Sequence, residues 1–100
     1  MNEYAEKHVY PVARIMMLQL MDAAPEGETN ARMLTALLQG SSAVLWFDQV
    51  VEQLKWLEKA GLCTVSEKSE IILAKVTRSG SLVAQGLKRV PGVDRPRGDV

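Results

Sequence analysis

The apolar pattern of this sequence changes its period at Gly61, and that change constrains the fold more than any other feature. Over residues 45–60 the apolar side chains recur at the i, i+3, i+4 spacing of an amphipathic helix. Beyond Gly61, residues 62–66 and 71–76 are rich in β-branched and apolar side chains, with the polar residues 67–69 between them. The sequence therefore predicts a helix that ends at a glycine and leads directly into a β-hairpin.

The first predicted helix covers residues 12–24, and its apolar band is wide. Pro11 either starts this helix or kinks a longer one, because proline suits the first helical turn and disrupts the interior. One face carries Val12, Ile15, Met16 and Leu20, and beside it lie Met17, Met21 and Ala24. Such a band predicts burial on more than one side, which would serve both the domain core and a dimer contact.

The second predicted helix runs from a cap at Thr29 or Asn30 to about Gln39, with Gly40 as its stop. Its expected inward residues are Ala31, Leu34, Leu37 and Leu38. The third helix, over residues 45–60, has an expected core face of Phe47, Val50, Val51, Leu54 and Leu57.

A last helix is predicted after the hairpin, over residues 78–89 with Thr77 as its cap. Its residues available for packing are Leu82, Val83 and Leu87. Gly80 and Gly86 weaken this helix, so we expect close packing to explain them. Residues 90–100, with two prolines and two glycines, are expected to form an extended tail.

The predicted order is helix, helix, helix, hairpin, helix. Three helices followed at once by a two-stranded hairpin are the arrangement of a winged helix-turn-helix. The predicted fold class is therefore mainly α with a small β-hairpin (α+β). We expect one domain over residues 1–89 and a Pro/Gly/Arg-containing tail over residues 90–100.

Composition excludes most catalytic and cofactor chemistry. The 100 residues contain one cysteine and one histidine, and the chain has no net charge. Cys63 lies in an apolar strand pattern, where a free cysteine is most often a small buried hydrophobe. One cysteine and one histidine also fall short of a four-ligand zinc site. We therefore expect no disulfide, metal or cofactor, and a protein that is not an enzyme.

The longest apolar stretch, near residues 12–24, is too short for a bilayer, which needs about 20 mostly apolar residues. Arg14, Gln19 and Asp22 also interrupt it. The N-terminal residues lack the basic start and apolar run of a signal peptide. We therefore expect a cytoplasmic protein without a membrane contact.

Several stretches of the sequence resemble known families. Residues 53–62, QLKWLEKAGL, resemble the end of the recognition helix in ArsR-like and MarR-like regulators. Residues 76–80, 83–86 and 90–96, VTRSG, VAQG and VPGVDRP, look like the small ArsR-like winged-helix proteins of Mu-like bacteriophages and prophages. This resemblance implies a phage-derived gene in a bacterial host, a winged-helix fold and a role in transcription regulation through DNA binding.

The sequence departs from that family pattern at the entry to the third helix. Residues 46–50 are Trp-Phe-Asp-Gln-Val, where the family tends to have Ser-Arg-Asp-x-Val. The capping serine and an arginine available to phosphate are thus both replaced. The metal-sensing role of ArsR-like regulators does not transfer, because Cys63 has no cysteine-rich surroundings.

Charge is unevenly distributed along the chain. Residues 1–70 contain six basic residues against ten carboxylates, whereas residues 71–100 contain six against two. DNA affinity comes largely from neutralised phosphates, and Asp48 and Glu52 on the third helix would repel them. A DNA contact would therefore depend on the C-terminal part. The candidate DNA-contact residues are Gln49, Gln53, Lys55, Lys68, Arg78, Lys88, Arg89, Arg95 and Arg97.

The two tryptophans suggest a protein contact instead. Trp56 lies opposite the core face of the third helix. It is either covered by the C-terminal segment or the start of the first helix, or exposed as an interface residue. The candidate interface residues are Trp56, Trp46, Met17 and Met21. Two hypotheses stay open: a dimeric phage regulator that binds double-stranded DNA, and a winged-helix module that binds a second copy or a phage protein.

Overall fold

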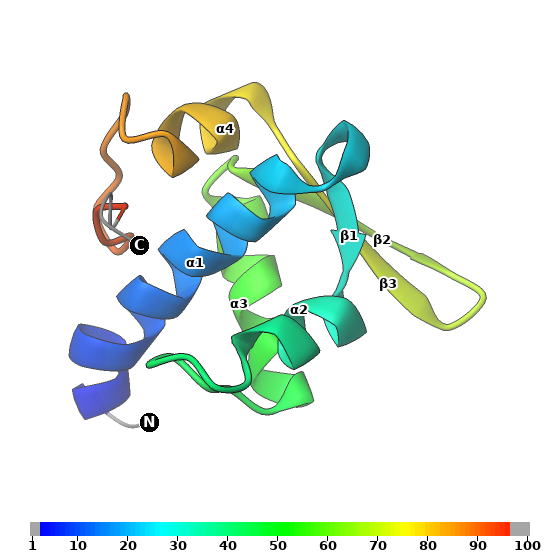
Figure 1. The fold of residues 1–100 in the computed structure, drawn as a ribbon, viewed down its shortest axis with the longest axis horizontal. Coiled ribbons are helices and arrows are strands. Elements are labelled where there is room, and N and C mark those ends of the chain that lie inside the picture. The colour runs from blue at the N-terminus through cyan, green and yellow to red at the C-terminus, as the bar shows by residue number, and fades with distance from the viewer. Residues whose placement is uncertain (1–2, 97–100) are drawn as a thin grey trace.

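Figure 1 shows the fold as a computed structural model, which describes residues 3–96. Within that range it has four α-helices and a three-stranded antiparallel sheet. The helices are α1 (Tyr10–Ala23), α2 (Ala31–Leu38), α3 (Phe47–Lys59) and α4 (Arg78–Ala84). The strands are β1 (Glu28–Asn30), β2 (Cys63–Lys68) and β3 (Ile71–Val76). A π-helical turn, η1 (Ala5–Val9), precedes α1, and a 3₁₀ turn, η2 (Pro25–Gly27), follows it.

Helix α1 continues directly from η1, so Pro11 lies inside a longer helix. In the π turn the N–H of Tyr10 donates to the carbonyl of Ala5. Proline cannot donate a backbone hydrogen bond, and its ring clashes with the carbonyl four residues earlier in a regular α-helix. The wider π turn relieves that clash, since it changes the hydrogen-bond spacing just before the proline. Of the two predicted alternatives, the longer helix is correct.

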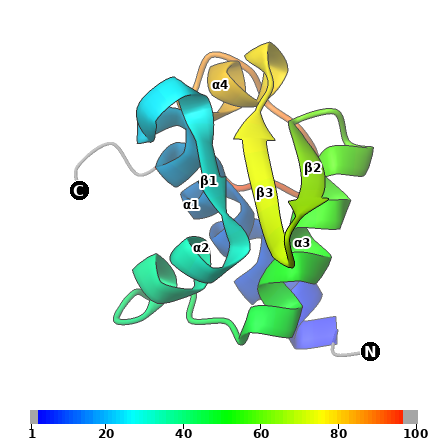
Figure 2. The same cartoon turned by 90° about the vertical axis from the view of Figure 1, so that its right-hand side faces the viewer.

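The sheet contains one strand that the sequence pattern did not predict. Figure 2 shows β1 beside β3, in the strand order β1-β3-β2. The two pair antiparallel, with Thr29 opposite Ala74, which is fully buried at the centre of the sheet. β1 has three residues, all polar, so it shows no apolar period from which a strand could be predicted.

Caps and glycines set the ends of α2 and α3. The side-chain oxygen of Asn30 accepts a hydrogen bond from the N–H of Met33 at 2.8 Å, so Asn30 is the cap of α2. Gly61 follows α3 with a φ of 81°, the left-handed conformation that ends helices at glycine. α2 ends at Gln39, whose backbone is already extended, and Gly40 with its φ of 80° lies in the turn that follows. The predicted stop at Gly61 is confirmed, whereas α2 leaves the helical conformation before Gly40.

The core lies between the sheet and one face each of α1, α2 and α3. The predicted core residues of α3 that are completely buried are Val50, Leu54 and Leu57. In α1 the completely buried apolar residues are Ala13, Ile15, Met17, Leu18 and Met21. Two predicted packing residues are not in the core, because Leu37 is 49% exposed and Leu87 is 71% exposed. α2 turns Ala31, Leu34 and Leu38 inward, which leaves Leu37 towards solvent.

Strands β2 and β3 form the predicted hairpin, here called the wing, but its turn lies later than predicted. Lys68 pairs with Ile71, so Ser69 and Glu70 form a two-residue turn. Their φ angles are 51° and 67°, and a type I′ turn requires positive φ at both positions. Neither residue is glycine or asparagine, so the usual signal of this turn is missing from the sequence.

Helix α4 begins as predicted and ends earlier. The side-chain oxygen of Thr77 accepts a hydrogen bond from the N–H of Gly80 at 3.0 Å. Close packing explains Gly80, because a Cβ there would lie 1.9 Å from the carbonyl oxygen of Leu62. It does not explain Gly86, where a Cβ would lie 3.5 Å from the Pro96 ring, an ordinary contact. Gly86 instead turns the chain at the end of the helix.

The C-terminal segment packs on the domain and does not extend away from it. We call residues 90–96 the strap. Its Asp94 N–H donates to the carbonyl of Pro11 at 3.1 Å, and Val93 is buried. The domain therefore includes the strap and exceeds the predicted boundary at residue 89.

The architecture is α+β, as predicted, and it is compatible with a winged helix. Helices α1, α2 and α3 precede the wing, and α4 follows it. The observed order differs from the predicted one by β1, which lies between α1 and α2 and completes the sheet.

Candidate functional site

The predicted DNA-contact residues do not lie on one surface. Those on α3 and the wing are Gln49, Gln53, Lys55 and Lys68, whereas those on α4 and the segment after it are Arg78, Lys88, Arg89 and Arg95. Figure 1 shows α4 at the top of the molecule and the start of α3 at the bottom. The remaining predicted residue, Arg97, lies outside the described range.

Gln53 is buried and holds a buried arginine. It is 4% exposed, and its Oε1 accepts a hydrogen bond from Nε of Arg14 at 2.8 Å. Arg14 lies in the middle of α1 and is 2% exposed. Because the amide of Gln53 faces the interior, it cannot contact a DNA base from this position. The prediction of Gln53 as a DNA contact is wrong.

Arg14 connects α1, α3 and the strap. Its Nη1 donates to the carbonyl of Gly92 at 2.9 Å, and its Nη2 lies 3.6 Å from a carboxylate oxygen of Glu6. Its guanidinium carbon lies 3.8 Å from the centre of the Trp56 ring, a close cation–π contact. Burial lowers the pKa of Arg14, and Glu6 partly offsets this effect. Since a buried charge is tolerated only when it is paired, these contacts fix the three segments relative to one another.

Trp56 is covered by the strap and by Arg14. Gly92 has a φ of 92°, and a Cβ there would lie 2.7 Å from the Trp56 ring. Of the two alternatives for Trp56, coverage by the C-terminal segment is correct, so this side chain is not a free interface residue. Met17 and Met21 are completely buried as well. The wide apolar band of α1 therefore serves the core, and it leaves neither methionine for a dimer contact.

Trp46, by contrast, is 79% exposed at the start of α3. Its backbone N–H donates to Oε1 of Gln49 at 2.8 Å. A glutamine at the third helical position supplies this bond in a capping box, so Gln49 compensates in part for the missing capping serine. The same bond engages Oε1 of Gln49, one of the two polar atoms of the amide that was predicted to contact DNA.

Five of the seven large apolar residues that are exposed in the described range lie on α2, the segment between α2 and α3, and the wing. They are Met33, Leu37, Val44, Trp46 and Ile71, each at least 49% exposed. Figure 1 shows α2 and the start of α3 together at the lower edge of the molecule. Exposed apolar patches on small proteins often mark interaction sites. We call these five residues, together with the half-buried Phe47, the apolar end.

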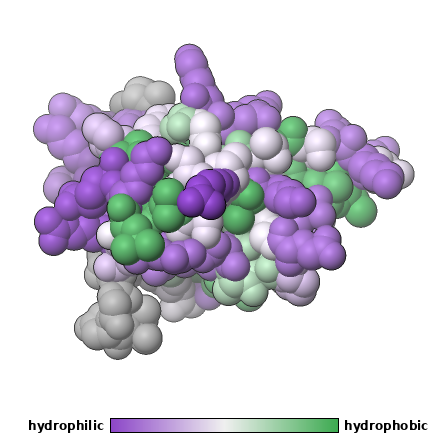
Figure 3. All heavy atoms as spheres, turned by 90° about the horizontal axis from the view of Figure 1, so that it is seen from above, coloured by the Kyte–Doolittle hydropathy of each residue, from purple (hydrophilic) through white to green (hydrophobic). Residues whose placement is uncertain are grey.

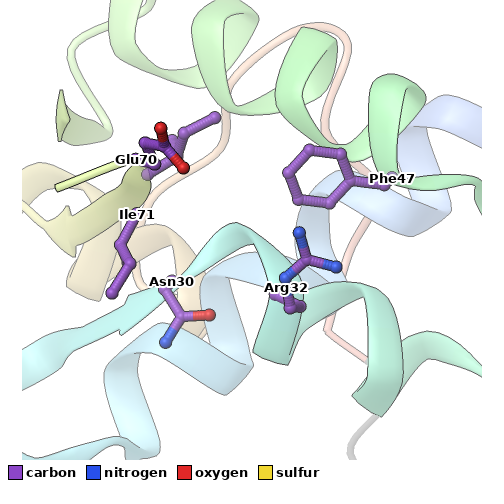
Figure 4. Close-up of a pocket in the computed structure, with 6 residues that line it drawn as sticks. Asn30, Arg32, Phe47, Glu70 and Ile71 are labelled. Carbon is purple, nitrogen blue, oxygen red and sulfur yellow. The ribbon is translucent and has the colours of Figure 1, made fainter. Parts of the chain in front are cut away.

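A pocket of about 300 Å³ opens at the apolar end, between α2, α3 and the wing (Figure 4). Its lining residues are Asn30, Arg32, Phe47, Glu70, Ile71 and Ile72. The guanidinium carbon of Arg32 lies 5.0 Å from the centre of the Phe47 ring. In Figure 4, Glu70 and Ile71 face this pair across the open space. The pocket therefore combines apolar walls with one positive and one negative group.

Charge around the apolar end is nearly balanced. The exposed basic residues there are Arg32, Lys55 and Lys68, and the exposed acidic residues are Asp48, Glu52, Glu67 and Glu70. A DNA-binding face normally carries a clear excess of positive charge. This end lacks such an excess, and its carboxylates oppose the approach of phosphates.

A second surface, which we call the cationic end, lies on α4 and the segment after it. Its exposed basic residues are Arg78, Lys88, Arg89 and Arg95. A groove of about 510 Å³ opens there, lined by Gln85, Gly86, Arg89, Arg95 and Pro96. Figure 3, which views the molecule from the α4 side, shows mostly hydrophilic residues with small, separate apolar areas.

Cys63 is a buried free thiol, and its burial agrees with its apolar strand pattern. Its Sγ lies 3.6 Å from the carbonyl oxygen of Leu54. Burial, and to a smaller extent the carboxylate of Glu58, raise the pKa of Cys63 to about 12. Within residues 3–96, no group of three or more His, Cys, Asp or Glu side chains is placed to hold a metal ion. None of the helices described is long and apolar enough to span a membrane.

Two arginines with clear roles in the structure were not predicted from the sequence. Arg14 joins α1, α3 and the strap, and Arg32 lines the pocket at the apolar end. For Arg14 a signal was available, because a charged residue in the middle of a wide apolar helix face needs a buried partner. For Arg32 there was none, since its contact with Phe47 depends on how α2 and α3 pack.

Comparison with known proteins links this chain to a bacteriophage. It is 32% identical over 83 residues to the uncharacterized protein gp26 of Escherichia phage Mu. The alignment covers 83% of this chain and 84% of the phage protein. No protein-family model matches the chain. The predicted phage association is thereby confirmed, while the ArsR-like assignment stays a prediction.

Proposed function

Because this chain belongs to the same family as the phage Mu protein gp26, we propose that it is a phage winged-helix protein that functions by binding another protein chain. The observation that carries this proposal is the apolar end. In a winged helix, the start of the third helix and the wing are the parts that meet DNA. Here those parts carry Trp46, Phe47 and Ile71 and no excess of positive charge.

The partner that this surface fits is a second copy of the chain. An interface across a two-fold axis must be self-complementary, because the same patch meets itself. The apolar end has exposed apolar residues for its centre and a nearly balanced set of charges for its rim. A rim of both signs can pair with its own copy, whereas a surface of one sign would repel it. The predicted homodimer is thus retained, with Trp46 in place of Trp56, Met17 and Met21 at its centre.

The proposal includes that the chain is not an enzyme. A reactive cysteine needs a lowered pKa and access to substrate. Cys63 has the opposite properties, since it is buried and its pKa is raised to about 12. The pocket at the apolar end is lined by a positive and a negative side chain that flank apolar walls, which suits the anchor residue of a partner.

Light scattering of the full chain over a concentration range that reaches about 300 µM tests the dimer, because dimers of micromolar affinity are fully formed there. We expect a mass twice the 11.0 kDa of one chain, and a monomer for Trp46→Ser. The matched control is Leu87→Ser, which removes another exposed apolar residue away from the apolar end and should leave the dimer intact. A chain that stays monomeric throughout, or a dimer that Trp46→Ser leaves unchanged, contradicts the proposal.

The alternative, that α3 and the wing contact DNA, predicts a different result. In that case the variant Lys55→Gln/Lys68→Gln would weaken binding to duplex DNA, because both lysines are exposed there. We expect no effect of this double variant on any DNA binding that the chain shows.

A further inference from the structure

We infer that the groove at the cationic end binds phosphate groups, and that their source is the backbone of double-stranded DNA. This inference concerns α4 and the strap and does not depend on the proposed contact at the apolar end. The groove brings together two segments of the chain, residues 85–89 and residues 95–96.

The two walls of the groove are held in place by packing. One wall is the turn after α4, with Gly86 and Arg89, and the other is the end of the strap, with Arg95 and Pro96. The two walls are in ordinary van der Waals reach of each other, because a Cβ added at Gly86 would lie 3.5 Å from the Pro96 ring. One arginine therefore lies in each wall of the groove.

Within residues 3–96 neither Arg89 nor Arg95 has a carboxylate within ion-pair distance, whereas Arg14 and Lys7 each have one. The other polar wall residue is already engaged, because Nε2 of Gln85 donates to Oγ of Ser81 at 2.9 Å. An anion in the groove would thus be held by the two guanidinium groups.

Further positive charge lies on the same segment. Lys88 reaches back along α4, where its Nζ lies 2.5 Å from Oγ of Ser79, next to Arg78. The cationic end therefore presents four basic side chains on α4 and the groove. Two carboxylates of the described residues lie near this surface: Asp22 accepts hydrogen bonds from Ser81 and Gln85, and Asp94 accepts one from the N–H of Arg95.

The chemistry of these groups favours a phosphate polymer over a single anion. Guanidinium groups bind phosphate oxygens through two parallel hydrogen bonds. Exposed arginines bind one free phosphate weakly, because water and salt compete for both. A duplex presents one phosphate charge per about 1.7 Å of axis, so several basic residues can be neutralised in one complex and counterions are released.

The test is fluorescence anisotropy of the full-length protein with a labelled duplex of random sequence. With four contacts we expect binding about 100-fold weaker at ~200 mM than at ~50 mM salt. The variant Arg89→Gln/Arg95→Gln should bind about 100-fold more weakly than wild type at ~50 mM salt and reduce the salt slope by about 2. The charge-matched control, Lys55→Gln/Lys68→Gln, should bind like wild type. All four side chains are exposed, and circular dichroism verifies that both variants fold.

A second measurement separates the two sources of phosphate. Sodium pyrophosphate is titrated in place of DNA, and the amide signal of Gly86 is followed by NMR. Shifts with DNA that the arginine variant abolishes support the inference. Shifts with pyrophosphate alone overturn DNA as the source, and no shift with either overturns the site. Equal losses in the arginine and lysine variants would also overturn it, because they would place the DNA contact elsewhere.

Discussion

Replacement of Arg14 by methionine tests the contacts that join α1, α3 and the strap. Methionine keeps the length and the apolar stem of the side chain but removes the charge and every donor. The substitution leaves Oε1 of Gln53 without its partner at 2.8 Å and removes the hydrogen bond to Gly92. It also removes the cation from its position 3.8 Å from the centre of the Trp56 ring.

The expected loss follows from these contacts. Each of the two hydrogen bonds with the charged donor contributes about 2 kcal/mol, and a desolvated cation–π contact adds about 2 kcal/mol. The ion pair with Glu6 adds little, because that carboxylate is 44% exposed. Relief from burying the guanidinium offsets part of the sum, as in other buried ion pairs, so we expect a net loss of about 3 kcal/mol. For a domain of this size that lowers the melting temperature by about 15 °C.

Urea unfolding followed by circular dichroism measures this loss, and we expect a midpoint about 2 M lower than that of wild type. The double variant Arg14→Met/Gln53→Leu should recover at least about 1 kcal/mol of the loss, because it removes the unpaired amide together with the arginine. A loss below about 0.5 kcal/mol for Arg14→Met would refute the reasoning, because surface substitutions alone reach that size. Strictly additive effects of the two changes would show that the two side chains do not interact.

Three further predictions concern the wing and its neighbours. Gly80→Ala should destabilise the fold by about 3 kcal/mol in urea unfolding, because its Cβ would lie 1.9 Å from the carbonyl oxygen of Leu62. Cys63 should not react with a thiol reagent near pH 9 until urea unfolds the protein. Because its pKa is raised in the folded state, stability should also fall as the pH rises from about 9 towards 12, and Cys63→Ala should remove that dependence. The variant Ser69→Asn/Glu70→Gly should raise stability by about 1 kcal/mol, since both positions have positive φ; no gain would argue against the type I′ turn.

Periodicity and caps predicted the helices and the wing because these signals are local. A helix cap depends on residues three positions apart, and the helix-ending glycines depend on their own φ. β1 could not be predicted from the local pattern, because its pairing with β3 joins residues that are far apart in the sequence. The π turn was equally hidden, since only the general conflict between Pro11 and a regular helix is visible in the sequence.

The candidate sites depended on tertiary packing, so their prediction succeeded only in part. Trp46 is left 79% exposed by the residues that the structure describes, which agrees with the interface prediction. Trp56 and Gln53 were placed on the outer face of α3 by helical geometry, which is correct for an isolated helix. The strap and Arg14 then cover that part of the helix, and neither contact has a sequence period from which it could be predicted.

Arg14 and the strap cover only part of α3, and this partial cover divides the helix into two parts that differ in what they could bind. Its first turn, near Trp46, is exposed, whereas its second half is covered where Arg14 and Gly92 lie on Trp56. A recognition helix that enters a DNA groove contacts base edges with residues along one free face. On α3 that face is blocked in the half near the strap, and in the other half it presents apolar and acidic side chains. The strap covers part of α3. It also carries Arg95, which lines the groove of the cationic end. The segment that covers part of α3 therefore also forms one wall of the groove that we propose binds phosphate, and the two proposed contacts lie on different parts of the molecule.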